Sequence, residues 1–154
     1  MVLLDTNVFI IDRFFPRDKR HKVNRAFIDQ LPKIEAGFCI FSLFELCGIC
    51  SFNLAPDELK RWMYHFDEVF DVQILEPQGL YTELAADWFE GFMHTIFGLF
   101  ERKVTWGDAV LLQAAEEYEV DAIVTWNKKH FENRTTIEVL TPQEYLNGSG
   151  GGEG

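Results

Sequence analysis

The sequence predicts a three-layer α/β/α sandwich around a five-stranded parallel sheet. Short apolar stretches, bounded by turn or polar residues, alternate along the chain with longer segments whose apolar residues recur at helical spacing. Strands that are apolar on both faces are typical of a parallel sheet that helices cover on each side. We expect the strands at residues 2–4, 38–41, 72–75, 122–124 and 137–140.

Three of the intervening segments carry helix-start signals. Ser42 and Glu45, directly after the second expected strand, have the spacing of a capping box, in which a hydroxyl residue and an acid cap the first turn reciprocally. Thr105 and Asp108 have related spacing ahead of a second apolar-periodic segment. Pro56 opens a segment that keeps helical spacing as far as residue 70, because proline suits a first helical turn.

The chain length and composition fit one domain. With 154 residues, 47% of them hydrophobic, we expect a domain over residues 1–146 and a flexible tail, rich in Gly and Ser, over 147–154. Acids interrupt every apolar run before it reaches the roughly 18 residues of a membrane span, and Asp5 comes too early for a secretory signal. We therefore expect no membrane association and a cytoplasmic location.

The cysteines fit a reducing compartment. The chain has three cysteines, Cys39, Cys47 and Cys50, and this odd number does not allow all of them to pair. Cys47 and Cys50 have C-x-x-C spacing, but they lie inside an expected helix and the sequence has no second pair to complete a zinc site. A structural role is the interpretation we favour.

Several polar residues are expected at one edge of the sheet. Asp5 ends the first strand, Glu45 follows the second, and Asn127 follows the fourth. The carboxyl ends of parallel strands share an edge, and ligands bind there where the strand order reverses. Asp108 begins the helix that leads to the fourth strand, so three carboxylates and an amide would converge. The alternative is that each acid is only a helix cap.

A cluster of carboxylates needs a proton or a cation, because two of them about 4 Å apart repel by roughly 4 kcal/mol. Oxygen donors without His or Cys favour Mg²⁺ or Mn²⁺ over zinc. The chemistry that suits such a site is hydrolysis of a phosphodiester bond.

Four segments together resemble the PIN domain family, in particular its small single-domain prokaryotic members, which include toxin ribonucleases of VapC type. The segments are LLDTNVF at 3–9, SLFEL at 42–46, GDAVLLQAA at 107–115 and IVTWNKKHF at 123–131. The resemblance spans residue 1 to about residue 145. It implies a sheet in the order 3-2-1-4-5, metal-dependent endoribonuclease activity, a homodimer and an antitoxin protein as partner.

The resemblance also assigns roles to individual residues. It implies that Asp5, Glu45 and Asp108 bind the metal, and that Asn127 occupies a fourth site position where the family often has Asp. Thr6 and Asn7 match positions that support the first acid, and Thr125 is placed with them as a supporting residue.

The charge of the chain bears on the substrate. Its 25 acidic and 14 basic residues give a formal charge of −11, which should repel nucleic acid. Yet six basic residues and one acid fall between positions 13 and 25, a local charge of +5. Arg13 and Arg17 in this segment, and Lys128 and Lys129 beside Asn127, are the candidates for contact with RNA phosphates; a solvated helix face is the alternative for the first group.

The sequence thus favours a Mg²⁺- or Mn²⁺-dependent endoribonuclease, the toxin of a type II toxin–antitoxin system. The alternatives are a non-catalytic PIN-like module that acts through protein contacts, and a housekeeping RNA-processing nuclease. A phosphatase of the haloacid dehalogenase type fits less well, because Asp5-Thr6-Asn7 lacks the second Asp of the D-x-D motif.

Overall fold

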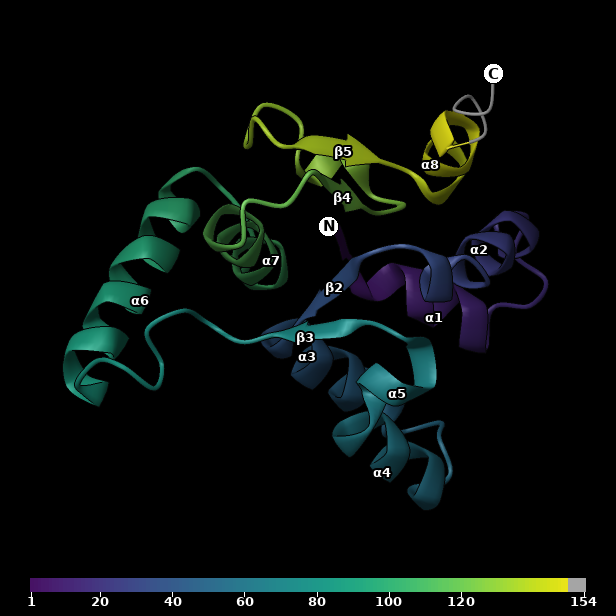
Figure 1. The fold of residues 1–154 in the computed structure, drawn as a ribbon, viewed down its shortest axis with the longest axis horizontal. Coiled ribbons are helices and arrows are strands. Elements are labelled where there is room, and N and C mark those ends of the chain that lie inside the picture. The colour runs from purple at the N-terminus through teal and green to yellow at the C-terminus, as the bar shows by residue number, and fades with distance from the viewer. Residues whose placement is uncertain (150–154) are drawn as a thin grey trace.

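The structure, a computed structural model, describes residues 1–149. Its centre is a five-stranded parallel sheet in the order β3-β2-β1-β4-β5 (Figure 1). This confirms the predicted fold class and strand order. The strands are β1 (Val2–Leu4), β2 (Ala36–Cys39), β3 (Gln73–Leu75), β4 (Ala122–Val124) and β5 (Glu138–Leu140).

Helices cover both faces of this sheet. Figure 1 shows α7 and α6 on one side and α1 and α2 on the other. The helices are α1 (Thr6–Phe14), α2 (His21–Ile28), α3 (Ile40–Cys50), α4 (Pro56–Tyr64), α5 (Phe66–Phe70), α6 (Ala85–Glu101), α7 (Trp106–Glu117) and α8 (Pro142–Ser149), with short 3₁₀ turns η1 (Leu31–Lys33) and η2 (Lys128–His130).

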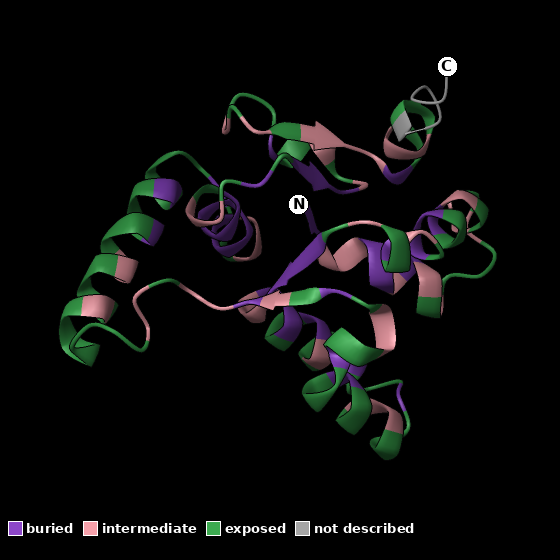
Figure 2. Ribbon diagram, viewed as in Figure 1, coloured by how far each residue is buried: buried purple, intermediate pink, exposed green. Residues whose placement is uncertain are grey.

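Alternation along the strands divides the core in two. Val2 and Leu4 pack with Phe38 against α1 to α5 on one face, whereas Leu3 and Ile123 pack against α6 and α7 on the other. Side chains of successive strand residues point to opposite faces, so strands that are apolar throughout supply both cores. Figure 2 shows the buried residues concentrated in the central strands β1, β2 and β4 and in α7, whereas the edge strands β3 and β5 are mostly exposed or half-buried.

The expected boundary of the second strand is wrong. β2 occupies Ala36–Cys39, and Ile40 and Phe41 already belong to α3. The helix therefore begins before Ser42, which is buried inside it, and Cys39 is the N-cap without a side-chain cap bond. The capping box predicted at Ser42 and Glu45 is absent for this reason, and Glu45 lies in the second turn.

The other helix starts are confirmed in position. α7 begins directly after Thr105, and α4 begins at Pro56. The continuous helix suggested by spacing up to residue 70 is instead divided at His65, whose backbone leaves the helical region between α4 and α5. A capping box that we did not predict opens α8, where Thr141 and Glu144 exchange hydrogen bonds with each other's backbone N–H groups.

Two further sequence predictions concern the carboxyl end of the chain and membrane-spanning helices. α8 ends at Ser149, so residues 147–149 of the expected tail are helical, and residues 150–154 lie outside the described part of the chain. Over residues 1–149, none of the helices has the length and apolar character needed to span a bilayer.

Candidate functional site

Asp5 lies at the junction of β1 and α1, where its carboxylate accepts four hydrogen bonds. It is the N-cap of α1 and accepts from the backbone N–H of Asn7 at 3.5 Å. The Thr6 hydroxyl donates to Oδ1 at 3.1 Å, and the Asn7 amide and Thr125 hydroxyl each donate to Oδ2 at 2.6 Å. The residues expected to support Asp5 therefore do contact it, and its cap role coexists with its place in the site.

Thr125 reaches Asp5 because β4 is the neighbour of β1. Leu4 pairs with Val124 in the parallel register, so the next residue of each strand emerges at the same edge. The buried Thr125 hydroxyl also accepts from the Asn7 amide and from the backbone N–H of Asn127, both at 2.9 Å. This network fixes the start of α1 to the loop after β4.

Asn127 takes part in this network through its backbone. Its N–H donates to Thr125, whereas its side chain is exposed and forms no hydrogen bond within residues 1–149. Its assignment as a fourth site residue stays a prediction.

Glu45 lies against the first turn of α7, because α3 and α7 pack together. A Cβ atom built on Gly107 would be 3.0 Å from each carboxylate oxygen of Glu45. The absence of a side chain at Gly107 thus makes room for this carboxylate beside Asp108. The N-terminal turn of a helix also carries a partial positive charge that favours a nearby anion.

Asp108 is held by two neighbours. Its Oδ2 accepts a hydrogen bond from the Thr105 hydroxyl at 2.8 Å and lies 3.2 Å from Nδ1 of His130. Thr105 therefore binds the acid and leaves the backbone of α7 without a side-chain cap. The sequence analysis did not predict the contact with His130, for which the position beside Lys128 and Lys129 was the only signal.

Neighbouring carboxylates help to raise the pKa values of Asp5 and Glu45. Burial raises the pKa of Asp5, the hydrogen bonds from Thr125, Thr6 and Asn7 oppose this, and the charge of Asp108 adds to the increase. The pKa of Glu45 is raised first by loss of surrounding water and then by the charges of Asp5 and Asp108. The site therefore favours binding a proton or a cation over leaving three acids ionised.

The donor atoms fit Mg²⁺ or Mn²⁺ in chemical type. Both oxygens of Glu45 and Oδ1 of Asp108 have no hydrogen-bond partner among residues 1–149, and all are hard carboxylate donors. In the described part of the chain, no three potential ligands are close enough together to form a complete metal site. The side chain of Glu45 is exposed, so its rotation can change the distance from the Glu45 carboxylate to the carboxylates of Asp5 and Asp108.

Two of the four candidate RNA-binding cations are paired with acids of this chain. Arg13 forms a two-pronged ion pair with Glu58, both contacts being 2.8 Å, and Lys128 contacts both oxygens of Glu144 at 2.9 Å. Arg17 and Lys129 are exposed and form no ion pair in the described residues.

The loop after β4 borders an open pocket of about 510 Å³. Asn127, Lys128, Lys129 and His130 are among its lining residues. Because His130 also contacts Asp108, this hollow adjoins the acids. Lys129 is thus the candidate cation best placed to reach a ligand there.

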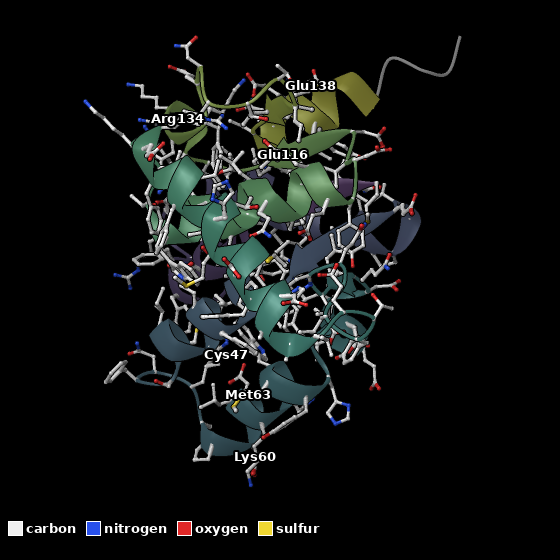
Figure 3. All side chains as sticks on the ribbon, turned by 90° about the vertical axis from the view of Figure 1, so that its left-hand side faces the viewer. Cys47, Lys60, Met63, Glu116, Arg134 and Glu138 are labelled. Carbon is white, nitrogen blue, oxygen red and sulfur yellow. The ribbon has the colours of Figure 1, made fainter. Side chains whose placement is uncertain are left out.

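The cysteines lie apart from the acids. All three are free thiols, and burial raises the pKa of Cys50 to about 11, which disfavours the thiolate that redox and metal chemistry needs. Cys47 and Met63 line an apolar pocket between α3 and α4, where Figure 3 shows them close together. This supports the structural interpretation of the C-x-x-C pair.

Comparison with known proteins supports the fold. Neither a family model nor a curated protein sequence matches the chain. Among solved structures it is similar to the crystal structure of FitAcB from Neisseria gonorrhoeae, with a TM-score of 0.61 and 17% sequence identity. The similarity covers 93% of this chain and 99% of that one. At this identity the comparison shows a shared fold.

Proposed function

We propose that the chain is a Mg²⁺- or Mn²⁺-dependent endoribonuclease in which Asp5, Glu45 and Asp108 hold the metal. The observation that carries the proposal is that acids from the end of β1, from α3 and from α7 face one edge of a parallel sheet, where the charge of Asp108 helps to raise the pKa of both Asp5 and Glu45. Three of the four motifs that resemble PIN domains contain these acids, and the fourth contains Thr125 and Asn127.

The residues around the acids have separable roles in this proposal. Thr6, Asn7 and Thr125 fix the orientation of Asp5, and Thr105 and His130 fix Asp108. When bound, the cation supplies Lewis-acid stabilisation to the phosphate undergoing hydrolysis. Glu45, the most exposed of the three acids, would complete the ligand set from α3, beside Gly107 in the first turn of α7.

A toxin role and its partners are part of the same proposal. The fold shared with FitAcB and the resemblance to small PIN toxins support a toxin of a type II toxin–antitoxin system, with RNA as substrate, an antitoxin protein as inhibitor and a homodimer as the active form. A neighbouring reading frame whose product abolishes the activity would distinguish a toxin from a housekeeping nuclease.

The test is cleavage of a labelled single-stranded RNA in the presence of Mg²⁺ or Mn²⁺. We expect EDTA to stop cleavage and Asp108→Asn to abolish it. Asp87→Asn is a matched control, because Asp87 also lies in the first turn of a long helix, α6, away from the site. Cleavage that survives both EDTA and Asp108→Asn would refute the proposal.

Metal binding separates this enzyme from a non-catalytic module. We expect millimolar Mn²⁺ to raise the unfolding temperature of the wild-type protein and of Asp87→Asn, but to have little effect on Asp108→Asn. Equal shifts in all three proteins, or no shift in any, would favour a module that acts through protein contacts.

A further inference from the structure

Exposed aromatic side chains lie one or two residues before two of the three acids. Phe44 comes before Glu45 on α3, and Trp106 comes two residues before Asp108 at the start of α7. The two rings are 63% and 47% exposed. Single exposed apolar side chains are common, whereas a contiguous group of them marks a surface that binds a ligand or a partner.

These rings belong to one connected group, which we call the aromatic rim: Phe41, Phe44, Phe92 and Trp106. The ring centroid of Phe41 lies 6.2 Å from that of Phe44 and 6.1 Å from that of Trp106. Phe92 supports it from α6, at 5.2 Å from Phe41 and 6.3 Å from Trp106. Edge-to-face packing of this kind holds the exposed rings in place before any ligand arrives.

The aromatic rim is continuous with the acids. Phe41 lies one helical turn before Glu45, so the two side chains share a face of α3. Trp106, which contacts Phe41, is followed directly by Gly107, the residue over which the Glu45 carboxylate lies. Phe44 stands at the far end of the rim and also borders the apolar pocket between α3 and α4.

Other aromatic residues near the site are not available in the same way. The indole N–H of Trp126 donates to the buried Asn24 at 2.7 Å, and Phe14 packs against the core. Phe15 is exposed, but it lies beyond the far end of α1, three turns from Asp5. The rim is therefore the aromatic surface that adjoins the acids.

We propose that the aromatic rim stacks unpaired nucleobases of the RNA, with Trp106 against the base next to the cleaved phosphodiester and Phe44 against a more distant one. This rests on the proposed ribonuclease function and adds to it two residues, Trp106 and Phe44, that bind bases near the cleaved bond. Bases in a duplex are already stacked and paired, whereas unpaired bases stack readily on aromatic side chains. The neighbouring acids favour a phosphate-bearing ligand, which brings a cation with it. A protein partner is less suitable, because its surface would bury the acids.

The test compares cleavage of one short single-stranded RNA with cleavage of the same RNA carrying an abasic nucleotide beside the cleavage site. We expect Trp106→Leu to lower kcat/KM about 5- to 20-fold on the intact RNA, because stacking on one aromatic ring is worth roughly that factor. On the abasic RNA the variant and the wild type should cleave equally. Trp106→Phe should retain most of the activity on intact RNA.

Controls separate stacking from loss of structure. Phe52→Leu changes a ring that is 89% exposed in the turn after α3, and it should cleave both RNAs like the wild type. Phe44→Leu should weaken cleavage less than Trp106→Leu. If Trp106→Leu lowers cleavage of intact and abasic RNA equally, or lowers neither, the stacking proposal is overturned and the rim is left as a surface for protein contact. Failure of the wild type to cleave any RNA would overturn the ribonuclease function itself.

Discussion

Replacement of Gly107 by alanine tests whether the space beside α7 exists for the Glu45 carboxylate. The added Cβ would lie 3.0 Å from both oxygens, closer than an ordinary van der Waals contact. The carboxylate is the end of an exposed side chain, so it can retreat by a few tenths of an ångström without moving the backbone of either helix. We therefore expect the fold to accept the substitution and the site to be altered by it.

Stability should rise slightly. Gly107 is the second residue of α7, and alanine loses less chain entropy than glycine on entering a helix, by about 0.5–1 kcal/mol. For a domain of this size that corresponds to an increase of about 1–4 °C in unfolding temperature without metal. Gly91→Ala is the matched control, because Gly91 lies within α6 and a Cβ there would meet nothing within 4 Å.

Metal binding should weaken. A displaced Glu45 carboxylate is expected to lower Mn²⁺ affinity about tenfold, the size of effect seen when groups that orient metal ligands are disturbed. Titration calorimetry measures this, and Gly91→Ala should bind Mn²⁺ like the wild type. Unchanged affinity in Gly107→Ala would show that Glu45 is not a ligand. If Gly107→Ala lowers the unfolding temperature while Gly91→Ala raises it, the Glu45 carboxylate cannot move away from the added methyl group.

Three further predictions concern the acids and the core. Because the pKa of Glu45 is raised, the folded chain keeps this proton to a higher pH than the unfolded chain does. The contribution of Glu45 to the unfolding free energy therefore falls as pH rises above 4.5. In urea denaturation between about pH 4 and pH 7, the unfolding free energy of Glu45→Gln should fall less with pH than that of the wild type. Thr125→Val should lower the unfolding free energy by about 1–3 kcal/mol, because it removes the three hydrogen bonds that the buried Thr125 hydroxyl forms around Asp5. Thr125→Ser should retain most of the wild-type unfolding free energy, and urea denaturation at neutral pH measures both variants. Phe38→Ala should lower the unfolding free energy by about 3–5 kcal/mol, because the Phe38 ring centroid lies 4.9 Å from that of Phe9 and 5.0 Å from that of the buried Phe66. Equal urea midpoints for this variant and the wild type would contradict the assigned core.

The centre of the sheet was predictable because β1 and β4 are short apolar runs followed directly by a polar residue. Asp5 and Thr125 mark the ends of β1 and β4, and in a parallel sheet those ends necessarily meet. The end of β2 was not predictable in the same way. Residues 36–41 are apolar or small throughout, so hydrophobic pattern alone cannot separate the last strand residue from the first turn of α3.

The contacts of the site depended on packing between distant segments. Glu45 was expected from a local capping pattern, yet its position is set by α3 packing on α7, which places it beside Gly107. The pairing of Arg13 with Glu58 joins residues 45 positions apart and carries no local signal. The sequence tells which residues carry charge, whereas the fold determines which of these charges are paired.

This distribution of charge bears on how an RNA would reach the acids. Two candidate phosphate contacts, Arg13 and Lys128, are already paired with acids of the chain, so they contribute little to the attraction of RNA. The overall charge of −11 and the raised pKa values of Asp5 and Glu45 favour a divalent cation as the first ligand. In the proposed function, RNA then binds to a site whose negative charge is already reduced. Stacking on uncharged rings supplies affinity that electrostatics does not, so substrate binding should depend less on salt than is usual for a protein with a basic groove.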